Sequence, residues 1–157
     1  MENFFDGQTL SIIIHLAVAL LLGMVIGVER VWAGKTAGIR TYALVSMGSA
    51  LFIIISELVS IKYLGLTSFD PMRMASQIIV GVGFIGSGLI FTQNSKPMGL
   101  TTATGLWVSA GIGIASGFGL FKLAIVSTVL TLFVFVILWF VEERVKKSKY
   151  FNKEEIE

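Results

Sequence analysis

The stretch DPMRMASQIIVGVGFIGSGLIF, Asp70–Phe91, decides how the rest of the sequence is interpreted. It opens with an acid, a proline and an arginine, and then becomes an apolar run interrupted by four glycines. Polar groups at the start of such a run are costly to bury without hydrogen-bonding partners. Glycines along a helix face allow another backbone to come close. We therefore expect a membrane helix with a polar entrance, packed against a second helix.

The composition of the whole chain is typical of a membrane protein. Of the 157 residues, 55% are hydrophobic and 14% are charged, whereas soluble domains carry about 25% charged residues. The absence of cysteine excludes disulfides and thiolate metal sites. The net charge is only +2, and the basic residues lie mostly between apolar runs. This distribution indicates membrane topology and argues against a nucleic-acid partner.

Five apolar segments approach the roughly 20 residues that a helix needs to cross a bilayer. They predict an all-α integral membrane protein with a five-helix domain over residues 1–141 and a charged cytoplasmic tail over residues 142–157. With the N-terminus outside and the C-terminus in the cytoplasm, nine of the twelve Lys and Arg residues fall on the inner side, as the positive-inside rule favours. The predicted spans cover about residues 10–28, 39–60, 71–92, 100–118 and 120–141.

Small residues predict which helix faces pack together. In lipid, helices associate where small side chains let the backbones approach. Such residues recur every four positions along the first and fourth predicted spans, so we expect these two helices to be buried in the bundle. The fifth span is the best candidate for the lipid-facing helix. The predicted packing positions are Gly23, Gly27, Gly81, Gly83, Gly86, Gly88, Gly105, Ser109 and Gly113.

Asp70, Arg73 and Gln77 are spaced so that they share one helix face. In the simplest interpretation Asp70 caps the helix, Pro71 is its first residue, and Arg73 reaches towards water. In the alternative the three side chains line a polar vestibule at the outer side, because ionisable groups in or near a membrane are functional-site candidates by default. Both interpretations can hold together.

A second polar group borders the first inner loop. Glu29, Arg30 and Arg40 are interpreted either as ordinary inner-side anchors with a local Glu–Arg pair, or as part of a site. In the second case Glu29 and Arg40 meet across the bundle and join Thr101 and Thr102, at the amino end of the fourth helix, where an anion could bind. The sequence leaves both alternatives open.

Several specific activities find no support in the sequence. Residues 81–86 match G-x-G-x-x-G, but they lie within an apolar span and no acid follows about 20 residues later, so helix packing is the better interpretation. His15, the single histidine, is interpreted as a packing residue. No nucleophile motif is present, and the acids are scattered. We predict a protein that is not an enzyme and has no cofactor, and leave any metal ligand unknown.

Three segments resemble the membrane domain of MgtC/SapB proteins. They are GVERVWAGKTAGIRTYALVSMGSALF (Gly27–Phe52), the stretch quoted first, and KPMGLTTATGLWVSAGIGIASGFGLF (Lys96–Phe121). The resemblance is to a short form without the C-terminal ACT-like domain of longer members. It implies a five-span protein of the bacterial inner membrane, associated with growth at low magnesium and, in pathogens, with survival inside macrophages. It also implies action through partners such as the F-type ATP synthase.

The motif positions implied by this resemblance coincide with the polar groups found on physical grounds. We expect a homo-oligomer, most simply a dimer, that modulates magnesium-linked ion or energy homeostasis by contacting other membrane proteins. An ion or small-solute transporter with a polar path through the bundle is the alternative, and a membrane ligand sensor is a third possibility. The polar motif positions are Glu29, Arg30, Arg40, Thr41, Asp70, Arg73, Gln77, Thr101 and Thr102.

Overall fold

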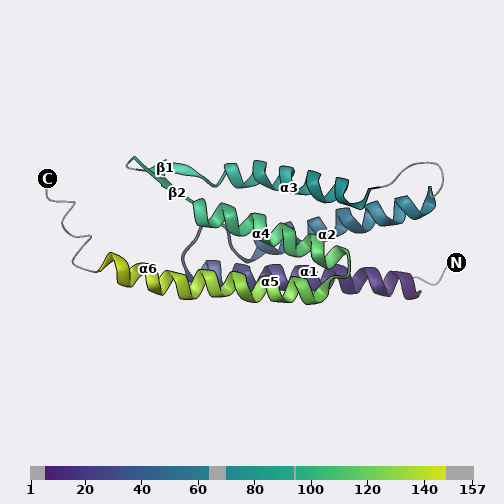
Figure 1. The fold of residues 1–157 in the computed structure, drawn as a ribbon, viewed down its shortest axis with the longest axis horizontal. Helices are drawn as coiled ribbons and strands as arrows, with labels where there is room; N and C mark the ends of the chain where they lie inside the picture. Colours follow the sequence, from purple (N-terminus) through teal and green to yellow (C-terminus); the bar gives the residue numbers. More distant parts are fainter. Residues whose placement is uncertain (1–5, 64–69, 94, 148–157) are drawn as a thin grey trace.

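The computed structural model describes residues 6–63, 70–93 and 95–147. Its long helices lie side by side and alternate in direction along the chain (Figure 1). A short antiparallel hairpin joins α3 to α4 and pairs Phe91 with Met98. The elements are α1 Gly7–Trp32, α2 Ile39–Lys62, α3 Pro71–Ser87, β1 Phe91–Gln93, β2 Lys96–Met98, α4 Leu100–Gly117, and a continuous run of α5 Phe121–Phe133, η1 Val134–Leu138 and α6 Trp139–Lys146.

Three of these helical runs are long and apolar enough to cross a membrane: Gly7–Trp32, Ile39–Lys62 and Phe121–Lys146. α3 and α4 have 17 and 18 residues, which corresponds to about 26 and 27 Å of helix. They therefore fall slightly short of the roughly 30 Å of a hydrocarbon core. The described chain thus has an all-helical architecture of membrane type, with three long apolar helices and two shorter ones.

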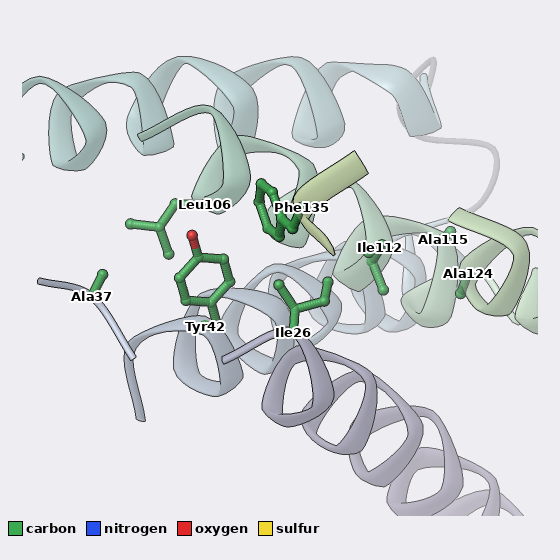
Figure 2. Close-up of a cluster of buried hydrophobic side chains, with 8 residues drawn as sticks. All are labelled: Ile26, Ala37, Tyr42, Leu106, Ile112, Ala115, Ala124 and Phe135. Carbon is green, nitrogen blue, oxygen red and sulfur yellow. The ribbon is translucent and has the colours of Figure 1, made fainter. Parts of the chain in front are cut away.

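α4 is the central helix of the bundle. It contacts α1, α2, α3 and α5, and eleven of its 18 residues are buried. α3 contacts α2 and α4, so it lies at the edge. On the other side, α5 packs against α4 and α1 through Ala124 and Thr128 and leaves its bulky residues exposed. Figure 2 shows the main apolar core, where side chains from α1, the α1–α2 connection, α2, α4, α5 and η1 meet: Ile26, Ala37, Tyr42, Leu106, Ile112, Ala115, Ala124 and Phe135.

The closest crossing of the bundle joins α1, α2 and α4 at Gly23, Ser46 and Gly113. A Cβ atom built on Gly113 would lie 2.0 Å from the carbonyl oxygen of Ser46, and one on Gly23 would lie 2.6 Å from that of Tyr42. Backbone atoms therefore occupy the space that any larger side chain would need. Gly27, Gly105 and Ser109 are buried in the same three-helix contact.

The glycines of α3 differ from this pattern. A Cβ on Gly81 or Gly83 would meet no atom within 4 Å, and one on Gly88 would meet only Ile85 of its own segment. Gly86 does face α4, since its Cβ would lie 3.6 Å from that of Ala103. Within the described chain, the packing surface expected along α3 is therefore used at Gly86 but not at the other three glycines. The reason is rotational: α3 turns the face that carries Ala75, Ile78, Val82 and Gly86 towards its neighbours.

The ends of two predicted spans also differ from expectation. α3 ends at Ser87, before the expected end near residue 92, because the β1–β2 hairpin takes up the following residues. Its tight turn places Ser95 at φ 59°. The last helix continues to Lys146, beyond the expected end at residue 141. The rest of the predicted tail, residues 148–157, lies outside the described residues.

Candidate functional site

Arg30 is a charged side chain buried near the end of α1. The residue is only 2% exposed. Its Nε donates a hydrogen bond to Oε2 of the adjacent Glu29, and its guanidinium carbon lies 3.5 Å from the centre of the Phe135 ring. A buried cation without a partner would cost several kcal/mol. Here the carboxylate and the negative face of the aromatic ring offset that cost.

Phe135 reaches Arg30 from an unusual segment of the last helical run. Val134–Leu138 are wound as a π-helix, a form that is rare and frequently found at functional sites. The flanking Val134 and Val136 are exposed, whereas Phe135 is 7% exposed. The ring that turns inward in this widened segment is the one that covers Arg30.

Tyr42 connects the same region to α2 and α4. Its side chain lies between Leu106 and Phe135 (Figure 2). The hydroxyl donates a hydrogen bond to the carbonyl of Thr102 at 3.1 Å, and Ser109 Oγ donates to the carbonyl of Tyr42 at 3.0 Å. Four segments, α1, α2, α4 and η1, therefore meet in one polar cluster. We call this cluster the arginine site and define it as Glu29, Arg30, Tyr42, Thr102 and Phe135.

The absence of a side chain at Gly105 makes room for the arginine site. A Cβ there would lie 2.5 Å from the Tyr42 hydroxyl oxygen and 2.7 Å from Cζ of Phe135. Any larger residue at this position would push Tyr42 or Phe135 out of place. Gly105 thus supports the site in addition to helix packing.

Two residues expected in this site have exposed side chains. Arg40 is exposed at the start of α2, and Thr101 is exposed at the start of α4. In the described residues Glu29 pairs with Arg30, so the local pair is formed and the pairing of Glu29 with Arg40 is not.

Asp70, Arg73 and Gln77 lie at the opposite end of the bundle, at the start of α3. Asp70 caps the helix, with Oδ1 accepting a hydrogen bond from the backbone N–H of Met72 at 2.9 Å. All three side chains are exposed. Gln77 borders a groove of about 610 Å³ between α2 and α3, whose other lining residues are mostly apolar. The two polar groups therefore form separate sites at the two ends of the molecule.

Sequence reasoning missed Tyr42 and Phe135. Tyr42 carried a usable signal, because a buried tyrosine hydroxyl usually needs a hydrogen-bond partner and the residue follows Arg40 and Thr41 directly. Phe135 carried none, since it stands within the uniformly apolar run LFVFVILWF.

A family model described as the MgtC family matches residues 16–144. The chain belongs to the MgtC family. This confirms the resemblance found in the sequence motifs. Both polar groups described above fall within the matched residues, so both belong to the part of the chain that the family model represents.

Individual relatives agree with this assignment. YhiD of Escherichia coli strain K12 is 45% identical over 132 residues, which cover 81% of this chain and 60% of YhiD. MgtC of Salmonella typhimurium strain LT2 is 44% identical over 120 residues, covering 76% of this chain and 49% of that protein. MgtC of Brucella abortus strain 2308 is 45% identical over 114 residues, which cover 73% of this chain and 45% of that protein. The chain thus spans about half of these MgtC proteins. No solved structure matches it significantly.

Proposed function

We propose that this MgtC-family chain is a multi-pass protein of the bacterial cytoplasmic membrane that modulates magnesium-linked ion or energy homeostasis without catalysing a reaction. It acts by contacting other membrane proteins, with the F-type ATP synthase as one such partner, and in a pathogen it contributes to virulence. The family match and the three long apolar helices support a membrane role. The name of the relative YhiD, which provisionally describes that protein as a magnesium transporter, supports the link to magnesium.

In this proposal all five helical runs cross the membrane, with the N-terminus outside. The alternating helix directions bring the α1–α2 connection, the hairpin and the end of α6 to one end of the bundle (Figure 1). Seven of the ten Lys and Arg residues in the described chain belong to those segments or border them. An excess of basic residues favours the cytoplasmic side, which supports this orientation.

The observation that carries the contact model is the close packing in the middle of the bundle. α1, α2 and α4 approach so closely at Gly23, Ser46 and Gly113 that no space is left between them. Two buried hydroxyls nearby donate to carbonyls of their own helices, Ser116 to Ile112 at 2.9 Å and Thr128 to Ala124 at 2.9 Å. Ser109 donates across to the carbonyl of Tyr42 in α2, and among the described residues the buried Ser46 Oγ has no hydrogen-bond partner. A conducting path needs groups that face a water-filled route. Tight packing of this kind favours contact with a partner over transport.

The rival model is a transporter in which Asp70, Arg73 and Gln77 lead from outside towards the arginine site. The two models give different results when the purified chain is placed in liposomes that contain a magnesium indicator. We expect no Mg²⁺ entry above that of protein-free liposomes. Mg²⁺ entry that is abolished by Asp70→Ala would favour the transporter.

Affinity capture from native membranes tests the contact model. The wild-type chain should recover partner proteins. Asp70→Ala or Arg40→Ala should lose these partners, whereas the control Lys147→Ala should retain them. Arg40 and Lys147 are exposed, and loss of the Asp70 cap costs only about 1 kcal/mol, so these changes should leave the fold intact.

We further propose that two copies pair across the groove between α2 and α3. Gly48 and Gly81 line this groove, and an added Cβ would meet nothing at either. Phe84, also at the groove, is 84% exposed. A two-fold axis would let the Phe84 of each copy enter the groove of the other, because a symmetric interface uses the same patch twice. Glycines on a membrane helix that have no atoms packed against them favour such a close contact with a second helix.

Cysteine cross-linking tests this dimer, since the chain contains no cysteine of its own. We expect Gly81→Cys to form a disulfide-linked dimer under mild oxidation in native membranes, because glycines at the contact bring the backbones together. The matched control is Ile125→Cys, on the exposed face of α5, which should remain monomeric. If Gly81→Cys and Phe84→Cys both give only monomer, the dimer is contradicted.

A further inference from the structure

A small pocket of about 140 Å³ lies at the end of the bundle opposite the arginine site. It is formed by the first turns of α1 and the last turns of α2, with Gly117 of α4 at one side. None of its residues belongs to the polar groups discussed above. Its polar side chains are Gln8, Ser11, His15 and Glu57, and its apolar wall is Ile12, Ile54, Leu58 and Ile61.

The hydrogen bond of His15 determines what the imidazole can offer to a ligand. Its Nδ1 lies 2.6 Å from the backbone carbonyl oxygen of Ser11. A carbonyl can only accept, so Nδ1 carries the proton, and in the neutral ring Nε2 is left as an acceptor. A tilted contact with the Phe121 ring, 4.9 Å between centroids, holds the imidazole in place. Among the described residues, Nε2 has no hydrogen-bond donor.

The pocket therefore combines three kinds of acceptor in one small space. Its lining includes His15, Glu57 and Gln8, whose side chains carry an imidazole nitrogen, a carboxylate and an amide oxygen that can accept hydrogen bonds. A primary ammonium group carries one positive charge and three N–H donors, and its methylene groups would fit against the isoleucine and leucine wall. A metal ion fits less well, because the described residues hold no group of three His, Cys, Asp or Glu side chains that could coordinate one. We propose that this pocket binds a primary ammonium group.

Depth and size agree with such a ligand. From Gln8, the second residue of α1, to His15 the pocket extends about 10 Å along the helix axis, which reaches from the headgroup level into the edge of the hydrocarbon core if α1 crosses the membrane. Its volume of about 140 Å³ is similar to that of a cavity, about 150 Å³, that admits benzene. An aminoethyl group is smaller than benzene. It could come from an aminophospholipid headgroup or from a soluble alkylamine.

Binding measurements on the full chain in lipid nanodiscs test this proposal. In phosphatidylcholine nanodiscs we expect ethylammonium to raise the melting temperature, since a ligand that binds the folded state stabilises it. Tetramethylammonium, which has the charge but no N–H donor, should not. Replacing half of the phosphatidylcholine with phosphatidylethanolamine should give the same stabilisation if the headgroup enters the pocket. Glu57→Gln should weaken binding by about tenfold or more, because it removes a charged hydrogen-bond partner.

The control variant is Glu142→Gln, an exposed glutamate at the other end of the bundle, which should bind like wild type. Stabilisation by ethylammonium alone would identify a soluble amine as the ligand, and stabilisation by phosphatidylethanolamine alone would identify a lipid headgroup. Any of three results would overturn the proposal. These are equal stabilisation by tetramethylammonium, unchanged binding in Glu57→Gln, and no stabilisation by either ethylammonium or phosphatidylethanolamine. Glu57 is exposed, so loss of the fold should not obscure the result.

Discussion

Gly113→Ala is expected to destabilise the bundle by about 3 kcal/mol, the upper end of what overpacking usually costs. The added methyl group would lie 2.0 Å from the carbonyl oxygen of Ser46. That oxygen belongs to the backbone of α2, so the clash can be relieved only by moving a whole helix. Unfolding of the purified chain by titration with SDS in mixed micelles, followed by circular dichroism, would measure the change.

Gly111→Ala provides the matched control on the same helix. A Cβ at Gly111 meets nothing within 4 Å, and alanine is a better helix former than glycine by up to about 1 kcal/mol. This variant should therefore be as stable as wild type or slightly more so. Equal losses in both variants would contradict this prediction, because only Gly113 lies at the crossing of α2 and α4 and helix propensity favours alanine at both positions.

Glu29→Ala is expected to destabilise the chain by about 3 to 5 kcal/mol, the range seen when one partner of a buried ion pair is removed. The side chain of Arg30 is 3% exposed, so its charge would remain buried with only the Phe135 ring beside it. The double variant Glu29→Gln, Arg30→Met removes both charges and should regain most of the lost stability, because a buried pair can often be replaced by neutral groups of similar size. The same SDS titration measures both variants.

The exposed pair of Glu142 and Lys146 serves as the comparison. These side chains lie 2.6 Å apart and each is 61% exposed, so Glu142→Ala should change stability by less than about 1 kcal/mol. If Glu29→Ala costs no more than Glu142→Ala, the arginine site does not hold the helices together. If the double variant is stable but fails to support growth at low magnesium in a bacterium that lacks its own MgtC-family protein, the arginine site has a functional role as well.

The two ends of the molecule differ in the kind of role they can have. At the arginine site, charge is buried among four segments, so any change there affects folding before it affects function. At the start of α3, Asp70 and Arg73 are exposed, and apart from the helix cap they are free to contact a partner. Variants of the second group are therefore the better probes of function.

Much of the local structure could be predicted from the sequence, and the reasons are visible in particular residues. Asp70 before Pro71 marks a helix start, and the structure places the cap there. Glycines spaced four apart in α1 and α4 predict that both helices are buried, and Gly23 and Gly113 each lie against the backbone of α2. Eleven of the 18 residues of α4 are buried, but only five of the 26 residues of α1. The same argument applied to α3 does not hold within this chain at Gly81 and Gly83, because spacing alone does not say which face of a helix meets a neighbour.

The sequence by itself determined the helical, membrane-type character of the chain, its family and the approximate bounds of its helices. These properties depend on hydropathy, local propensity and short motifs, which are read along the chain. Only the tertiary structure decided that α3 lies at the edge of the bundle, that Glu29 pairs with Arg30 rather than Arg40, and that Phe135 covers the pair. Each of these depends on the rotation of a helix about its own axis and on contacts between residues as distant as Arg30 and Phe135, which no local pattern specifies.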